Sequence, residues 1–106
     1  MRHVEKALSK IGKTDFIKIT NLEDTKGIPP IVSFTIQSDP IKEVGVNGCQ
    51  AVDMLIYVKY LFESLNETFH SPYNDTTIAH IENAIQAQHL RTEDRIKRNV
   101  EGTNNP

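Results

Sequence analysis

The chain has 106 residues, a common size for a single domain, and 38% of them are hydrophobic and 25% charged. Its formal net charge of -2 at pH 7 argues against a nucleic-acid polymer or an anionic membrane as the partner, because both attract basic surfaces. Cys49 is the single cysteine, which excludes an intrachain disulfide framework and a zinc site built from several thiolates.

The amino terminus is charged and carries no apolar stretch behind the charges. The longest apolar run, Met54 to Val58, is much too short to span a bilayer. We therefore expect an intracellular protein that is neither exported nor embedded in a membrane by its own signals.

Residues 1–46 have the pattern of a small antiparallel β hairpin. Phe16 to Asn21 alternates between two faces, and Ile31 to Ile36 places its large apolar side chains on one face. Glu23 to Gly27 has the residues of a turn, and Pro29-Pro30 should delay the second strand and keep it out of a central position in a sheet. These features predict a single domain of the α+β class that begins with its β part.

Residues 47–103 should form an antiparallel hairpin of two amphipathic helices. The first runs from about Gln50 to Asn66 at helical spacing. The second begins at Ser71-Pro72, because Ser caps free N–H groups and Pro fits the first turn, and it ends near Gly102. Each helix has apolar positions left over for another subunit, so we expect a homo-oligomer that is at least a dimer. The tail, residues 104–106, is expected to be loose.

Three arginines, Arg91, Arg95 and Arg98, fall at i, i+4 and i+7 on one face of the second helix. A simple structural explanation is a pair of exposed ion pairs at i, i+4 spacing, each worth about 0.3–0.5 kcal/mol: Glu93–Lys97 and Asp94–Arg98. This explanation leaves Arg91 and Arg95, which repel each other unless an anion lies between them. A phosphate or pyrophosphate is a suitable anion.

Five aromatic residues are expected to gather around the turn between the helices: Tyr57, Tyr60, Phe62, Phe69 and Tyr73. An aromatic face beside an arginine pair could stack a base while the arginines bind phosphate. The alternative is core packing, which the spacing favours for Phe62 and which stays equally open for Phe69. Asn74 has an amide that could bind a base or ribose edge, and it is also an ordinary residue for a first helical turn.

No pattern for catalysis or metal binding is convincing. Cys49 has no general base at a supporting spacing, and His80-Ile81-Glu82 is half of a zinc deaminase signature without its cysteine pair. His80 and His89 do not share a helical face, and a glycine-rich phosphate loop is missing. We expect no catalytic residues, no metal and no cofactor.

Residues 47–103 contain a set of short motifs that are considered together. They are Asn47-Gly48-Cys49-Gln50 with Asp53, then Asn74, Ile78, Ile81-Glu82, Ala84-Ile85, Arg91-Thr92-Glu93-Asp94-Arg95 and Val100-Glu101-Gly102-Thr103. Together they resemble the carboxy-terminal helical hairpin shared by two families of phage counter-defence sponges. One is the Thoeris anti-defence family, which sequesters cyclic ADP-ribose isomers, and the other is the anti-CBASS family, which sequesters cyclic oligonucleotides. The β hairpin is similar to the Thoeris family, because the anti-CBASS family is essentially all helical.

The resemblance implies that Asn74, Arg91 and Arg95 line a pocket for glycocyclic ADP-ribose at a dimer interface, with Phe62 or Phe69 stacking on the ligand. It also implies hexamers, a second kind of site for cyclic di- and trinucleotides, and a place in the host bacterial cytoplasm. The chain departs from the family at two places: Pro72-Tyr73-Asn74 replaces Arg-Glu-Asn, and Ala87 replaces an aromatic residue.

We therefore expect a sponge that blocks Thoeris or CBASS immunity by holding the signal without degrading it. In that case alanine at Arg91 or Arg95 should abolish capture and barely change stability. The first alternative is a helical-hairpin DNA-binding or antitoxin-like regulator, which should be basic and bind with steep salt dependence. The second alternative is a structural assembly protein, which would bind no small molecule.

Overall fold

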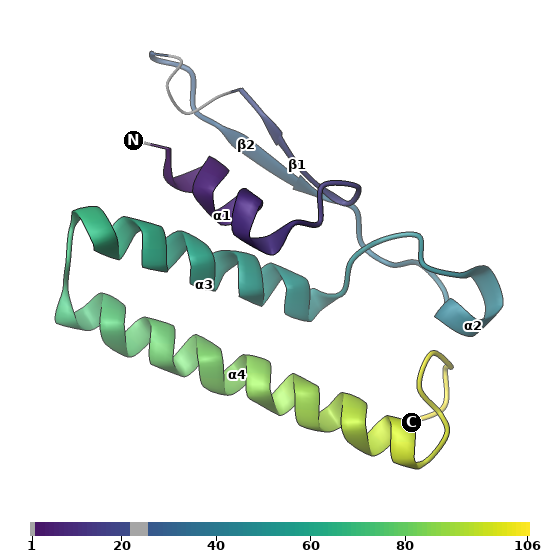
Figure 1. Cartoon of the computed structure of the whole chain (residues 1–106). Helices are drawn as coiled ribbons and strands as arrows, with labels where there is room; N and C mark the ends of the chain where they lie inside the picture. The colour runs from purple at the N-terminus through teal and green to yellow at the C-terminus, as the bar shows by residue number, and fades with distance from the viewer. Residues whose placement is uncertain (1, 22–25) are drawn as a thin grey trace.

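The structure is a computed structural model that describes residues 2–21 and 26–106. In chain order its elements are α1 (His3–Ile11), β1 (Ile17–Thr20), β2 (Ile31–Phe34), α2 (Ile41–Val44), α3 (Ala51–Thr68) and α4 (Pro72–Lys97). The small sheet, α1, α3 and α4 follow one another as layers, with α1 between the sheet and α3 (Figure 1). The predicted α+β class, a β hairpin followed by two C-terminal helices, is confirmed.

The hairpin is antiparallel, as predicted, with Ile17 opposite Phe34 and Thr20 opposite Ile31. Both strands are shorter than the sequence pattern indicated, and β2 begins directly after Pro29-Pro30. Residues 22–25 of the expected turn lie outside the described residues.

Helix α1 was not predicted, so residues 1–46 are not purely a β part. Val4, Ala7, Leu8 and Ile11 have helical spacing and place an apolar stripe against the core. Gly12 ends the helix with a positive φ of 68° and donates its N–H to the carbonyl of Leu8 at 3.0 Å. The short α2 is a second helix in this part of the chain.

The core lies between the sheet, α1 and α3. Its buried hydrophobic residues come from all three and from the loop before α3: Ala7, Ile17, Cys49 and Tyr57. The ring of Tyr57 meets that of Phe34 edge to face at 5.7 Å between centroids, so a side chain of α3 reaches the sheet beside α1. Among the described residues of α4, only Arg95 is buried, so α4 covers α3 with one face and leaves the rest to solvent.

Helices α3 and α4 are antiparallel neighbours joined by a short turn, as predicted (Figure 1). The Ser71 side chain caps α4 by accepting from the N–H of Tyr73 at 3.2 Å. Asn66 fixes the turn, because its amide accepts from the N–H of Ser71 and donates to Asp75. Helix α4 ends at Lys97, earlier than expected, and a hydrogen-bonded loop follows.

None of the helices within residues 2–21 and 26–106 combines the length and apolar character that crossing a bilayer requires.

Candidate functional site

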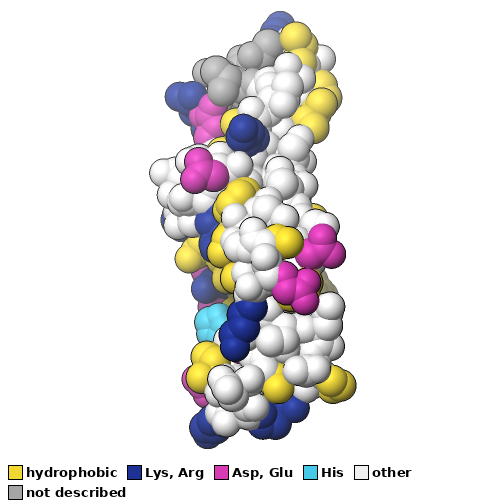
Figure 2. All heavy atoms as spheres, turned by 90° about the vertical axis from the view of Figure 1, so that its right-hand side faces the viewer, with side chains coloured by type: hydrophobic (Ala, Val, Ile, Leu, Met, Phe, Trp, Pro, Cys, Tyr) yellow, Lys and Arg dark blue, Asp and Glu magenta, His cyan; other side chains and the backbone are white. Residues whose placement is uncertain are grey.

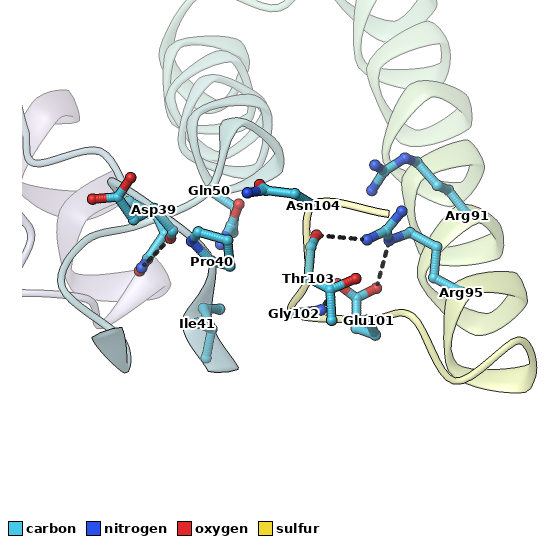
Figure 3. A pocket seen from close by; sticks show the side chains of 11 residues that line it. Asp39, Pro40, Ile41, Gln50, Arg91, Arg95, Glu101, Gly102, Thr103 and Asn104 are labelled. Atoms are coloured by element: carbon cyan, nitrogen blue, oxygen red, sulfur yellow. Dashed lines mark hydrogen bonds and ion pairs between the residues drawn. The ribbon is translucent and has the colours of Figure 1, made fainter. Parts of the chain in front are cut away.

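A polar groove lies where α2, the start of α3 and the end of α4 meet (Figure 3). Its first cavity, about 270 Å³, is lined from three directions by Gln37 and Asp39 to Ile41, by Gln50, and by α4 with the chain that follows it. A second cavity of about 500 Å³ extends the groove between the first turn of α3 and α4. The two cavities share the lining residues Ile41, Gln50, Arg91 and Glu101. We call both together the α4 groove.

The wall formed by α2 is held by a side-chain clamp between Gln37 and Asn47. The Gln37 amide nitrogen donates to the carbonyl of Gly45 at 2.9 Å, and its oxygen accepts from the N–H of Asn47 at 3.0 Å. Asn47 in turn accepts from the N–H of Ser38 at 2.9 Å and donates to its carbonyl at 3.0 Å. These bonds close the ends of the loop that carries α2 and so fix one side of the groove.

Gly48 connects this clamp to α3 through a close backbone contact. The N–H of Cys49 donates to the carbonyl of Thr35 at 2.8 Å, and its carbonyl accepts from Gln37 at the same distance. A Cβ at position 48 would lie 2.4 Å from the carbonyl carbon of Ile36, so only glycine fits. Burial raises the pKa of the Cys49 thiol, which makes it a poor nucleophile.

Arg95 is buried and clamps the chain that follows α4. Its Nη1 donates to the carbonyl of Asn105 at 2.8 Å, and its Nη2 donates to the carbonyls of Val100 at 2.9 Å and Thr103 at 3.1 Å. Its Nε lies 3.6 Å from Oε2 of Glu101, which is an ion pair and too long for a hydrogen bond. The guanidinium therefore donates to main-chain oxygens. Only 7% of the Arg95 side chain is exposed to solvent.

Residues 99–106, which follow α4 and include the tail, form hydrogen bonds with α4 and α2. Besides the bonds from Arg95, Nη1 of Arg98 donates to the carbonyl of Pro106 at 2.6 Å. The N–H of Lys42 donates to the carbonyl of Gly102 at 3.1 Å and connects this segment to α2. Gly102, Thr103 and Asn104 line the first cavity, so the segment is a wall of the groove, and two guanidiniums and α2 hold it through its carbonyl groups.

Arg91 lies one turn before Arg95, and its guanidinium points into the groove (Figure 3). It is exposed and lines both cavities, and its side chain forms neither an ion pair nor a hydrogen bond with another described residue. The lining carboxylate nearest in the chain, Glu101, is paired with Arg95. Arg91 is therefore a cation available to an anion in the groove.

The remaining predicted site residues lie at the other end of the hairpin. Phe62 is half-buried on α3, Phe69 is 60% exposed where α3 ends, and Asn74 is half-buried in the first turn of α4. Asn74 and Arg91 are 17 positions apart on one continuous helix, which is about 26 Å at 1.5 Å per residue. One chain therefore brings Arg91 and Arg95 together and keeps Phe62, Phe69 and Asn74 away from them.

Phe69 and Tyr73 flank the turn between α3 and α4, but the predicted gathering of aromatic side chains there does not include Tyr57 and Tyr60. Tyr57 lies in the core, and Tyr60 lies beneath the ammonium groups of Lys10 and Lys59, at 5.7 and 5.4 Å from its ring centroid. The spacing along α3 directs these rings to different sides, toward α1 and the sheet rather than toward the arginines.

Of the two predicted ion pairs on α4, Asp94–Arg98 is confirmed at 3.0 Å. The Glu93–Lys97 pair does not occur among the ion pairs of the described residues.

Other candidate chemistry is buried or dispersed. His3 and Ser64 are hydrogen-bonded at 2.9 Å, but they are 8% and 1% exposed, so no substrate can reach them. In the part of the chain that the structure describes, no three His, Cys, Asp or Glu side chains are grouped so that they could hold a metal ion.

The sequence assigned no binding role to most of the groove residues, and four polar ones line the first cavity: Gln37, Gln50, Glu101 and Asn104. They come from three separate stretches of chain, and only the fold brings them together. Asn104 points toward Gln50 across the groove (Figure 3). Glu101 was visible as part of the Val100 to Thr103 motif, but its partner could not be read from spacing alone.

Neither models of known protein families nor the curated proteins contain a match to this chain.

Proposed function

We propose that the protein captures a cyclic ADP-ribose isomer, such as glycocyclic ADP-ribose, in the α4 groove and holds it without converting it. Capture would silence a Thoeris-type immune signal in the bacterial cytoplasm. The observation that carries this proposal is Arg91, an exposed guanidinium that points into a polar groove and is not neutralised there by a paired carboxylate. A planar guanidinium matches the oxygens of a phosphate or pyrophosphate in a bidentate way.

The shape of the groove supports a ligand of nucleotide size. Its two cavities, about 270 and 500 Å³, share lining residues, and small-molecule sites usually have volumes of about 300–1,000 Å³. Gln50 and Asn104 line the first cavity with amide groups, which can donate to and accept from ribose hydroxyls. Inorganic phosphate alone would leave most of this space empty.

Arg95 has a different role from Arg91. Its Nη1 and Nη2 atoms are engaged by the carbonyls of the tail, so it is a positioning residue that holds the wall beside the ligand. Arg91 is the residue that contacts phosphate. This division replaces the expectation that both arginines bind the ligand in the same way.

A second copy of the chain would complete the site. Asn74 and Phe69 are too far along the hairpin to reach Arg91 within one chain, so they can join it only from a partner whose α4 runs in the opposite direction. Residues 86–94 of α4 are all exposed, including Leu90 at 55%, and provide a surface for that contact. Hexamers and a separate site for cyclic di- and trinucleotides stay predictions of the resemblance.

The test is capture without conversion. The protein is mixed with excess cyclic ADP-ribose isomer, the free pool is removed, and the protein is heat-denatured to release what it held. We expect unchanged ligand in proportion to the protein added. Release of a linear product, or steady loss of the excess ligand, would reveal an enzyme. Capture of duplex DNA with steep salt dependence, and of no nucleotide, would favour the DNA-binding regulator.

A further inference from the structure

The second cavity contains groups that the proposed phosphate contact does not use. Its walls are Ile41, Ala51 and Val52 on one side, and Gln88, His89 and Thr92 of α4 on the other. It opens beside Arg91, which belongs to both cavities. A ligand bound by phosphate at Arg91 would therefore extend directly into this space.

We infer that the second cavity is an adenine subsite, in which His89 stacks on the base and Gln88 binds its edge. This inference rests on the proposed function for the identity of the whole ligand. It assigns the base to α4 residues of the same chain that supplies Arg91, rather than to Phe62 or Phe69.

His89 is the aromatic ring that the groove itself offers. Among the described residues that line either cavity, it is the sole aromatic one. It is exposed, and its side chain makes no hydrogen bond or ion pair with another described residue. Bases bound outside a duplex stack on rings such as Phe, Tyr, Trp and His. Ala51 and Val52 offer an apolar surface on the opposite wall, as a flat base requires.

The amide of Gln88 gives the subsite its base preference. A glutamine amide has a donor and an acceptor side by side, which match N7 and the N6 amino group of adenine. Hypoxanthine presents the acceptors N7 and O6 at this edge, so one of the two hydrogen bonds would be lost. Gln50 lies on the wall shared by both cavities and can assist from the start of α3.

The groups along the groove could each bind one part of an adenine nucleotide. The second cavity would hold the base, Arg91 at the shared wall would hold phosphate, and the amide groups of the first cavity would hold ribose. Each part of the ligand then meets the chemistry that recognises it.

Calorimetric titration tests the subsite with three probes: cyclic ADP-ribose, its hypoxanthine analogue and AMP. The variants are His89→Ala and Gln88→Leu, with Gln86→Ala as a matched control on the same helix outside both cavities, and circular dichroism verifies their helical content. We expect His89→Ala to weaken binding of cyclic ADP-ribose and AMP by roughly 5- to 150-fold. The parent should prefer cyclic ADP-ribose over the hypoxanthine analogue by about 10-fold, and Gln88→Leu should remove this preference.

The outcomes separate the two proposals. If His89→Ala and Gln88→Leu bind like the parent while Arg91→Ala does not, the adenine subsite is overturned and the proposed function stands. If the parent binds AMP but no cyclic ADP-ribose isomer, and His89→Ala weakens AMP binding, the subsite stands and the proposed function is overturned. If the parent does not bind AMP, or if His89→Ala binds it as tightly as the parent does, the subsite is overturned.

Discussion

Arg91 and Arg95 lie one helical turn apart on α4, yet Arg95 is 5% exposed and bonded to three main-chain carbonyls while Arg91 is exposed and faces the groove. The carbonyls around Arg95 offset its positive charge, which reduces the repulsion expected between two adjacent guanidiniums. The same sequence spacing thus produces one structural and one accessible arginine. Lys and Arg side chains are also visible at the lower end of the face in Figure 2, where α4 ends.

Replacing Arg95 by alanine should destabilise the free protein by about 3 kcal/mol. The variant loses three charge-assisted hydrogen bonds, and the carbonyls of Thr103 and Asn105 lose the donor that Arg95 supplies. Urea unfolding measures the change. Arg91→Ala, which removes no such bond, should stay within about 0.5 kcal/mol of the parent. Equal stability of the two variants would show that the clamp around Arg95 contributes nothing.

Among the glycines of the chain, Gly48 should be the one whose replacement by alanine destabilises the protein most, because backbone atoms surround the position of its Cβ. Its Cβ would lie 2.4 Å from the Ile36 carbonyl carbon, so the contact between β2 and the start of α3 must shift, at a cost of about 3 kcal/mol. Gly12→Ala is the control, since its Cβ would meet nothing within 4 Å and only its φ of +68° costs about 1–2 kcal/mol. Thermal melting of both variants gives the comparison, which a smaller loss at position 48 would contradict.

The hairpin and the two long helices could be predicted because their side chains repeat with a regular period. Helix α1 has a helical repeat of apolar residues too, from Val4 to Ile11, followed by Gly12. The helix is only nine residues long, so its repeat is too short to stand out from the strand pattern that follows. The end of α4 was less predictable, because the helix stops at a left-handed cap on Asn99, whose φ is +58°, with the N–H of Asn99 bonded to the carbonyl of Ile96. Gly102, the residue type more usual for such a cap, indicated a later end.

The candidate site could be predicted only where it follows helical spacing. Arg91 and Arg95 share a face of α4, so they were found together. Arg95 is buried and Arg91 is exposed because residues 100–106 fold back over Arg95. The N–H of Lys42 in α2 holds this segment through the carbonyl of Gly102. Contacts of this kind join distant segments through the main chain, and local spacing holds no information about them.

The Glu67 carboxyl should titrate below its ordinary range. A hydrogen bond from the Lys6 ammonium at 2.8 Å, together with its charge, lowers the pKa of this carboxyl. Because the folded-state pKa is lowered, the stabilisation is present above the unfolded-state pKa and is lost as the pH falls through the folded value. NMR titration of Lys6→Ala should show the pKa of Glu67 rising toward its ordinary value. An unchanged pKa would mean that the pair is not formed in solution.

The free protein should be larger than one chain. Helix α4 exposes residues 86–94 on all sides, and Leu90 and Ile96 are 55% and 61% exposed, which favours burial against a second copy. Light scattering at micromolar concentration should give at least twice the 12.0 kDa of a single chain. A Leu90→Glu variant should shift the mass downward. If the parent scatters light as a monomer, the proposal that Asn74 and Phe69 reach the groove from a second copy is contradicted.

The most direct measurement is a titration of cyclic ADP-ribose isomers into the parent protein, Arg91→Ala and Lys97→Ala. Lys97 is the matched control, because it is an exposed basic residue in the last turn of α4 and lines neither cavity. Loss of the charge-assisted bond from Arg91 to phosphate should weaken binding by about 10- to 150-fold, while Lys97→Ala should bind like the parent. If Arg91→Ala binds as tightly as the parent, or if the parent binds no isomer, the capture of a nucleotide signal at this groove is contradicted.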